Sequence, residues 1–329
     1  MSGRTGVSVP DVDVVMIAYN KARYIDEAIA GVMAQKGDFR LRLIVMDDCS
    51  TDATPEIIDR WRRRFPDKIL NVRNPRNLGL QGNYVAGFRL VTARYMAICD
   101  ADDYWCSSRK LSRQIAYMES HPECALTFHR VINYYESTGE KSLSHSQRPS
   151  DGDIGQLSRC NFITNLSVVY RRELVDLTAL PDWILTDRSP DYVMHMLYAA
   201  RGMIHFFNRP MGVYRKAEGS SWSLTERFEQ LKMAFVARRN LLEHFGDGHP
   251  AAEGLRDSAR SLLEAMRGCG GSAERQAYVD REASDLGIVL AEYVAADTGS
   301  RSGMRRPILS RIRGLVSRFL PRPRPPRLA

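Results

Sequence analysis

Short apolar runs alternate with amphipathic stretches along the first part of the chain. Four of these runs have the length of buried strands: 12–18, 41–46, 69–72 and 96–99. Between them apolar residues recur at helical spacing, as at Ile25, Ala28, Ile29, Val32 and Met33. Strands that alternate with helices predict βαβ units and a mainly parallel sheet. We therefore expect an α/β fold.

The pattern changes beyond residue 124. A long strand is predicted over 125–135 and a helix over 190–200, followed by two short strands at 204–207 and 212–214. From residue 224 to about residue 296 the apolar spacing is helical throughout, with breaks at glycine-containing turns. We therefore expect a helical extension over residues 224–300, followed by a separate tail over 301–329.

The tail differs from the rest of the chain in charge. Residues 301–329 contain nine arginines and no acid, so that the net charge of +8 becomes −1 without them. Within 305–320, apolar residues at helical spacing predict a basic amphipathic helix, which is typical of an anionic membrane surface. A helix that packs on the protein itself, or that binds an acidic partner, is the alternative. The nearly neutral remainder argues against nucleic-acid binding.

No apolar run approaches the ~18 residues of a membrane-spanning helix. The first ten residues are polar and lack the apolar core of a signal peptide. The six cysteines include no CxxC pair, which favours thiols in a reducing compartment. We therefore expect a cytoplasmic protein, held peripherally at the inner face of the cell membrane by its tail.

Acidic residues follow two of the predicted strands. They are Asp47 and Asp48 after the second strand, and Asp100, Asp102 and Asp103 after the fourth. Because the carboxyl ends of parallel strands meet at one edge of a sheet, both clusters are expected in one crevice. Oxygen ligands gathered in this way favour a divalent cation, Mg²⁺ or Mn²⁺, with substrate phosphates completing its shell. The alternative for an isolated Asp-x-Asp is a solvated acidic turn.

Several other nucleotide and metal motifs are missing. No GxGxxG follows the first strand, and neither GxxxxGK[ST] nor HExxH occurs in the chain. This weakens dinucleotide-binding, P-loop and zinc-protease interpretations.

A series of ordered motifs in residues 1–223 resembles glycosyltransferase family 2. The motifs are Ile17-Ala18-Tyr19-Asn20, Asp47-Asp48-Cys49-Ser50-Thr51-Asp52, Asn77-Leu78-Gly79, Asp100-Ala101-Asp102-Asp103, Lys110-Leu111 with Gln114, and Pro210-Met211-Gly212-Val213-Tyr214-Arg215. The resemblance implies a GT-A fold with a Rossmann-like, mainly parallel sheet. It also implies a catalytic domain over 1–223, with a nucleotide-sugar half at about 10–122 and an acceptor half at about 123–223.

The resemblance further implies an inverting glycosyltransferase of the hexosyltransferase class. The donor would be a nucleotide-diphosphate sugar and the acceptor a saccharide or a lipid-linked group, in cell-surface polysaccharide or glycoconjugate synthesis. Asp48 would accept a hydrogen bond from the nucleobase, on which Tyr19 would stack, and Asp100 would contact the ribose. The remaining implied donor contacts are Ala18, Asn20, Gly79, Asp102 and Arg215.

Two roles near the diphosphate follow from the same resemblance. Asp102 would bind the metal, and Asp103 is either a second metal contact or a supporting partner of Asp102. Arg215 and Lys216 are candidates to stabilise the charge of the leaving diphosphate.

An inverting transfer needs a carboxylate that takes the proton of the acceptor hydroxyl. The family places this acid at a helix start on the acceptor side, and Asp191 lies just inside a helix that Pro190 is expected to initiate. We therefore expect Asp191 to be the catalytic base, with Asp187 as the second candidate.

Two other functions remain open at this point. A nucleotidyltransferase-type enzyme on a related fold usually carries a glycine-rich loop after its first strand, whereas residues 18–23 contain no glycine. A non-catalytic nucleotide-sugar-binding or scaffold protein would be expected to lose its acids. Here Asp100, Asp102, Asp103 and Asp191 are all present.

Overall fold

A computed structural model of the chain describes residues 10–144, 150–216 and 225–290. The tail helix expected over 305–320 lies outside these residues, so its membrane contact stays a prediction. Within the described ranges, no helix combines the length and the apolar character needed to cross a membrane.

The described residues contain one ten-stranded mixed sheet. Eight strands follow the order β3-β2-β1-β4-β9-β6-β10-β5, while β7 pairs with β6 and β8 with β10. Their bounds are β1 Val12–Ala18, β2 Leu41–Asp47, β3 Ile69–Arg73, β4 Tyr95–Ile98, β5 Tyr104–Trp105, β6 Cys124–Tyr135, β7 Lys141–Leu143, β8 Asp151–Gly152, β9 Val169–Arg171 and β10 Met203–Lys216. The β1, β2, β3 and β4 strands are mutually parallel, and β9 runs antiparallel between β4 and β6. The predicted α/β class is confirmed.

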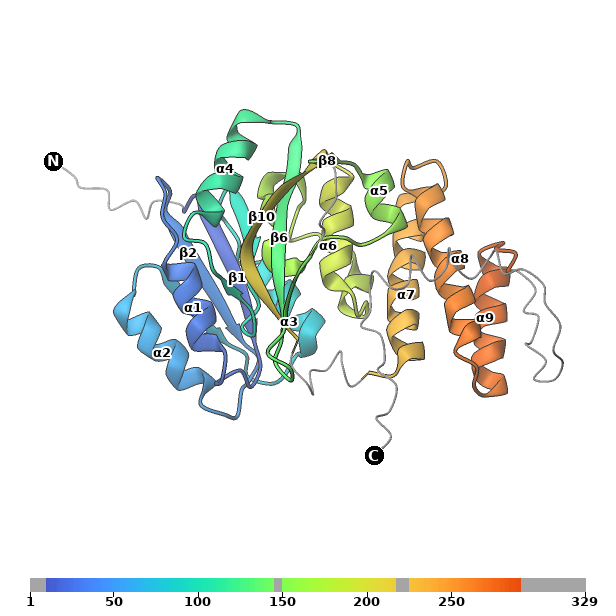
Figure 1. The fold of residues 1–329 in the computed structure, drawn as a ribbon, viewed down its shortest axis with the longest axis horizontal. Coiled ribbons are helices and arrows are strands. Elements are labelled where there is room, and N and C mark those ends of the chain that lie inside the picture. Colours follow the sequence, from blue (N-terminus) through green and yellow to red (C-terminus); the bar gives the residue numbers. More distant parts are fainter. Residues whose placement is uncertain (1–9, 145–149, 217–224, 291–329) are drawn as a thin grey trace. The chain divides into compact units, whose positions relative to one another are not determined.

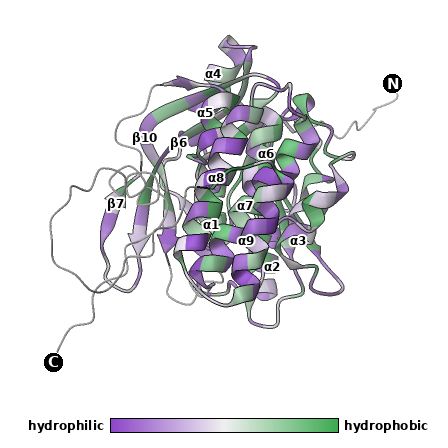
Figure 2. Ribbon diagram, turned by 90° about the vertical axis from the view of Figure 1, so that its right-hand side faces the viewer, coloured by the Kyte–Doolittle hydropathy of each residue, from purple (hydrophilic) through white to green (hydrophobic). Residues whose placement is uncertain are grey.

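The described residues also form helices, several of which flank this sheet (Figure 1). Their bounds are α1 Ile25–Met33, α2 Thr54–Arg64, α3 Gly79–Phe88, α4 Lys110–Ser120, α5 Ile154–Arg159, α6 Pro190–Ala199, α7 Arg227–Phe245, α8 Ala252–Gly268 and α9 Ala273–Asp285, with short 3-10 turns η1 Asn165–Ser167, η2 Arg172–Leu174 and η3 Asp182–Leu185. Hydrophobic and hydrophilic residues alternate along α7 and α8 (Figure 2). The chain divides into two compact units after Leu262, within α8.

The apolar runs are continuous because the central strands are covered on both faces. All seven residues of β1 are buried. Val14 belongs to the same core cluster as Ile29 of α1. On the other face a Cβ on Gly87 of α3 would lie 3.0 Å from side-chain atoms of Val15 and Met46, so this helix approaches the sheet closely. Alternate residues of a strand point to opposite faces, and six of the seven β1 residues are apolar; the seventh, Asp13, is buried in an ion pair with Arg42 at 2.8 Å.

The prediction of two short strands at 204–207 and 212–214 was wrong in one respect. They are parts of one strand, β10, whose register against β6 shifts on both sides of Pro210. Proline lacks the N–H that a regular ladder requires, and such irregularities are common at proline within a sheet. The continuous strand carries Arg215 to the acidic loop that follows β4.

A fully buried lysine lies in α4. Lys110 has no exposed surface, its ammonium lies 4.2 Å from the ring centroid of Trp105, and it donates to the Val168 carbonyl oxygen at 3.5 Å. Burial lowers the pKa of Lys110 to about 7. Above about pH 7, Lys110 is therefore mostly neutral in the folded protein, whereas it keeps its proton in the unfolded chain up to about pH 10.4.

We predict that Lys110→Met changes how stability depends on pH. Between about pH 7 and pH 10.4 the unfolded chain binds more protons at Lys110 than the folded protein does, so this residue makes stability rise with pH by up to ~1.4 kcal/mol per pH unit. Relative to wild type, the variant should therefore gain most at or below pH 7, and the gain should shrink as the pH rises. Urea unfolding across pH 6–10 measures this, with Lys36→Met, at an exposed lysine, as the control. Parallel curves for Lys110→Met and wild type would contradict the prediction.

Candidate active site

Three loops leave the sheet at the same edge. In the parallel ladder Ala18 at the end of β1 pairs with Asp47 at the end of β2, and Val15 pairs with Ile98 at the end of β4. The chain segments that follow these strands therefore emerge side by side. They carry most of the residues that the sequence singled out.

The first two loops are joined by hydrogen bonds. The backbone N–H of Asn20 donates to Ser50 Oγ at 2.9 Å, and its side-chain oxygen accepts from the Thr51 N–H at 2.8 Å. Asn20 has φ 52°, in the left-handed region that asparagine tolerates better than most residues. These contacts fix the loop that carries Tyr19, whose side chain remains 46% exposed at the sheet edge. Ala18 is buried beneath it.

Asp48 orders the segment before α3. Its Oδ1 accepts from Asn74 Nδ2 and from the Leu78 N–H, both at 2.8 Å, and its Oδ2 accepts from the Gly79 N–H at 3.0 Å. Gly79 has φ 75°, which a side chain would make unfavourable. A carboxylate offers about four lone pairs, so three are already occupied. The nucleobase contact expected of Asp48 stays a prediction and would use the remaining one.

The residue before Asp48 makes an Asx-type contact in this loop. The Ser50 N–H donates to Asp47 Oδ1 at 3.1 Å, not to Asp48. Asp47 has no exposed surface, and one of its oxygens lies 3.3 Å from Arg73 Nε. Asp47 is therefore part of the loop scaffold.

The three acids after β4 have different surroundings. Asp100 accepts hydrogen bonds from the Tyr84 hydroxyl and, at 3.0 Å, from Asn165 Nδ2. Burial, together with the charge of Asp102, raises the pKa of Asp100 to about 6. Asp103 is 4% exposed and accepts from the Arg215 N–H at 2.9 Å, and burial raises its pKa well above the ordinary value.

Asp102 is the accessible member of the group. Its side chain is 36% exposed, and its Oδ2 lies 2.6 Å from the ammonium of Lys21 in the loop after β1. Burial acts to lower the pKa of Lys21, but the charge and the hydrogen bond of Asp102 outweigh it, so that this pKa is raised above its ordinary value. The sequence reasoning did not select Lys21. Its only signal was its position directly after a strand that ends at the acidic edge.

Arg215 contacts the backbone of the acidic loop. Its Nε donates to the backbone oxygen of Asp102 at 3.1 Å, and its guanidinium is paired with Glu27 and lies over the rings of Tyr24 and Tyr104. The side chain is only 8% exposed. In this arrangement Arg215 stabilises the loop, and the donor contact expected of it stays a prediction. Lys216 donates to the Tyr135 hydroxyl at 3.4 Å.

Asp191 lies in the first turn of α6, directly after Pro190 at the helix start. Burial raises the pKa of Asp191 above its ordinary value. Its charge in turn contributes to the raised pKa of Asp100 and of Tyr84. Such charge effects act over short distances, so Asp191 lies near Asp100 and Tyr84.

Asp187 is held in a different way. It has no exposed surface, its Oδ1 accepts from the Ser189 N–H at 2.8 Å, and its Oδ2 accepts from Asn240 Nδ2 of α7 at 3.0 Å. Arg238, also in α7, lies 4.3 Å above the ring of Tyr192. Asp187 therefore links the two helices: its Oδ2 contacts α7, and its Oδ1 contacts the backbone just before α6.

Among these acids, Asp102 is the residue that could hold a divalent cation. Among residues 10–144, 150–216 and 225–290 no group of three His, Cys, Asp or Glu side chains is arranged to hold a metal ion by itself. Mg²⁺, however, commonly takes one or two carboxylates and completes its shell with substrate phosphates and water. Asp102 is accessible and already attracts a cationic group, the ammonium of Lys21.

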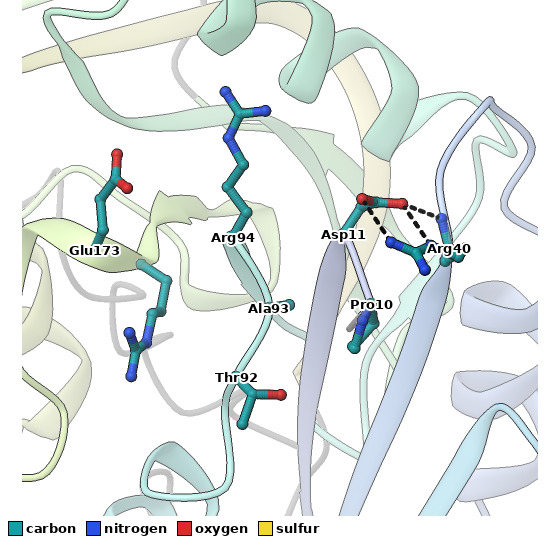
Figure 3. Close-up of a pocket in the computed structure, with 8 residues that line it drawn as sticks. Pro10, Asp11, Arg40, Thr92, Ala93, Arg94 and Glu173 are labelled. Atoms are coloured by element: carbon teal, nitrogen blue, oxygen red, sulfur yellow. Dashed lines mark hydrogen bonds and ion pairs between the residues drawn. The ribbon is translucent and has the colours of Figure 1, made fainter. Parts of the chain in front are cut away.

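A cavity of about 350 Å³ lies elsewhere, at the opposite ends of β1 and β4 (Figure 3). Its lining comprises Pro10, Asp11, Arg40, Thr92, Ala93, Arg94, Arg172 and Glu173. Arg40 is paired with Asp11 at 3.3 Å and Arg94 with Glu119 at 2.7 Å. These two arginines are paired, and the cavity lies at the other end of the strands from the acidic site.

Comparison with known proteins agrees with this geometry. Residues 13–177 match the model of "Glycosyl transferase family 2". An uncharacterised protein of Mycobacterium tuberculosis is 33% identical over 270 residues, which is 81% of this chain and 71% of that protein. "UDP-Glc:alpha-D-GlcNAc-diphosphoundecaprenol beta-1,3-glucosyltransferase WfaP" of Escherichia coli is 30% identical over 71% of this chain and 86% of its own length.

Two solved structures share the fold. TarS of S. aureus, in complex with UDP-GlcNAc, superposes with a TM-score of 0.62 at 15% identity, covering 84% of this chain and 80% of that one. The mannosyltransferase PcManGT of Pyrobaculum calidifontis, in complex with GDP-Man and Mn²⁺, gives a TM-score of 0.56 at 19% identity over 85% and 81%. These likenesses establish the GT-A fold. Together with the family match, they show that this chain is a glycosyltransferase and belongs to glycosyl transferase family 2.

Proposed function

We propose that this glycosyltransferase is an inverting enzyme that uses a nucleotide-diphosphate sugar and a divalent cation. One observation carries the proposal: the carboxylates of Asp102, which is accessible, and of Asp191, at a helix start, both lie close enough to Asp100 for their charges to raise its pKa. An inverting displacement needs these two functions, charge neutralisation at the leaving group and a base at the acceptor.

The donor side is proposed to use the loops after β1, β2 and β4. Tyr19, exposed at the sheet edge, stacks on the nucleobase. Ala18, Asn20, Asp48 and Gly79 shape the surface around the base, and Asp100 contacts the ribose. Asp102 holds the cation together with the donor diphosphate. When bound, such a cation neutralises the negative charge that develops on the departing nucleoside diphosphate.

Asp103 and Arg215 are proposed to act through Asp102. The Asp103 carboxylate accepts from the Arg215 N–H, and the Arg215 side chain donates to the Asp102 backbone oxygen. This closed set of contacts holds the backbone of the acidic loop in place. We therefore favour Asp103 as a supporting partner of Asp102 over a second metal contact.

Asp191 is proposed as the base that takes the acceptor proton. Its carboxylate belongs to the first turn of α6, where the helix dipole favours the ionised form, while burial favours the neutral form. The opposing effects suit a group that must be ionised before transfer and protonated after it. Asp187 has both oxygens engaged and lacks this freedom.

The acceptor is proposed to be a saccharide or a lipid-linked saccharide in cell-surface polysaccharide or glycoconjugate synthesis. Support comes from the printed names of relatives, among them the diphosphoundecaprenol-dependent WfaP and the "Abequosyltransferase RfbV" of Salmonella typhimurium. The basic sequence of residues 305–320 supports a peripheral position at the inner face of the membrane, where such acceptors would be presented.

A thermal-shift screen tests the donor side of this proposal. The full chain is melted with UDP, GDP, CDP, ADP and dTDP, each with and without Mn²⁺. We expect one nucleotide to raise Tm, and to do so only when Mn²⁺ is present, because the proposed cation joins its diphosphate to Asp102. A ligand at 100 times its Kd adds about 2.7 kcal/mol of stability. The matching nucleoside monophosphate is the control, since it lacks the second phosphate. If no diphosphate shifts Tm under either condition, the proposed donor class is wrong.

A further inference from the structure

The closest contact of the accessible acid is a lysine. Lys21 Nζ lies 2.6 Å from Asp102 Oδ2, and the two side chains are 31% and 36% exposed. A divalent cation bound to the same oxygen at about 2.1 Å would leave no room for the ammonium, and the two positive charges would repel. Lys21 and a divalent cation therefore compete for Asp102.

The neighbouring acids offer a cation little alternative. Both oxygens of Asp100 accept hydrogen bonds, from Tyr84 and Asn165, and Asp103 is buried against the backbone of Arg215. Asp102 thus has the carboxylate that a cation can reach from solvent. In the free protein, this carboxylate is paired with Lys21.

The backbone of Lys21 is fixed, while its side chain can turn. Its N–H donates to Thr54 Oγ1 at 2.8 Å, and the preceding N–H, of Asn20, donates to Ser50. The side chain beyond the Cα is a flexible stem that ends in a partly exposed ammonium. An ammonium that leaves Asp102 keeps its charge and is stabilised by another anion within its reach. The diphosphate of a donor bound at this edge is such an anion.

We propose that Lys21 makes binding of the divalent cation depend on the nucleoside diphosphate. In the free enzyme Lys21 occupies Asp102 and keeps its affinity for the cation low. When the nucleoside diphosphate binds, Lys21 moves from Asp102 to a phosphate oxygen, and the carboxylate becomes available to the cation. This inference rests on the proposed function, because it assigns a diphosphate to the same edge.

The consequence is a positive coupling between two ligands. By thermodynamic reciprocity, the factor by which the nucleotide strengthens cation binding equals the factor by which the cation strengthens nucleotide binding. Lys21 contributes to this factor twice, because it weakens cation binding in the free enzyme and adds a phosphate contact in the complex. Removing its charge should reduce the coupling.

Mn²⁺ binding to the full-length protein tests the proposal, with free Mn²⁺ measured from its EPR signal. Without nucleotide, Lys21→Met should bind Mn²⁺ about two- to fivefold more tightly than wild type, which corresponds to the strength of one partly exposed ion pair. Lys21→Arg keeps the charge and should resemble wild type. Lys36→Met, the same change at an exposed lysine, should do so too. Lys21→Gln provides a second neutral variant in case the methionine variant does not fold.

The same titration with each of UDP, GDP, CDP, ADP and dTDP completes the test. The nucleotide that binds should strengthen Mn²⁺ binding less in Lys21→Met than in wild type. Unchanged Mn²⁺ affinity in both neutral variants without nucleotide would overturn the inference, as would an unchanged coupling. If wild type couples Mn²⁺ to a nucleotide and Lys21→Met does so equally, this inference fails while the proposed function stands. If wild type binds none of these nucleotides, the proposed function fails, and the Mn²⁺-only comparison still decides the competition.

Discussion

Replacing Asp191 with asparagine is expected to lower kcat by about 10²–10⁴-fold, the usual contribution of a positioned general base. Donor binding should be nearly unchanged, because the residue lies on the acceptor side, at the start of α6. Asparagine has almost the same size but cannot take a proton at neutral pH. The measurements are kcat with saturating donor and the donor Kd in the presence of Mn²⁺.

The pH dependence of the wild-type enzyme gives a second measure of the same residue. Burial raises the pKa of Asp191 above 3.8. A base must be ionised to act, so kcat should be retained above this raised pKa and lost as the pH falls through it. The inflection should therefore lie at a higher pH than for an exposed aspartate. In Asp191→Asn the residual activity should lack this acid limb.

Asp187→Asn is the matched control. Asp187 joins the start of α6 to Asn240 of α7, so its replacement should lower Tm. The kcat per folded molecule should stay close to that of the wild type. If instead Asp191→Asn retains transfer and Asp187→Asn abolishes it without unfolding, the base is Asp187 and the proposed assignment is wrong.

Replacing Asp102 with asparagine is expected to abolish the Mn²⁺-dependent stabilisation by nucleoside diphosphate and to lower kcat by about 10²–10³-fold. The reason is that a cation stabilises the leaving-group charge by several kcal/mol, and each 1.36 kcal/mol corresponds to a factor of ten. Asp102 is the accessible carboxylate of the acidic loop, whereas Asp103 is buried. Thermal shift with and without Mn²⁺, together with kcat, measures both effects.

The fold of the Asp102 variant should be preserved, because this side chain is partly exposed and makes one ion pair, with Lys21. Asp67→Asn, at an exposed position away from the sheet edge, controls for a general effect of lost charge. Retention of a full Mn²⁺-dependent shift in Asp102→Asn would exclude Asp102 as the main protein contact of the cation.

The sequence by itself determined the class of fold and the edge that carries the site. The run 12–18 is strand β1 with unchanged bounds, because all its residues except Asp13 are apolar and a strand covered on both faces accommodates that pattern. Asp48 and Asp100 follow parallel strands, so topology alone brought their loops together. Pro190 likewise marks the start of α6, because proline is favoured at the first position of a helix.

Tertiary structure decided which of these polar groups are accessible. Arg215 and Asp102 are equally prominent in the sequence motifs. In the structure the Arg215 side chain is buried against Tyr24 and Tyr104, whereas Asp102 is partly exposed. The decisive contacts join residues far apart in the chain, such as Lys21 with Asp102 and Asp187 with Asn240. Local periodicity specifies which face of an element is buried, but hydrogen bonds depend on distances of about 3 Å that only the packed chain fixes.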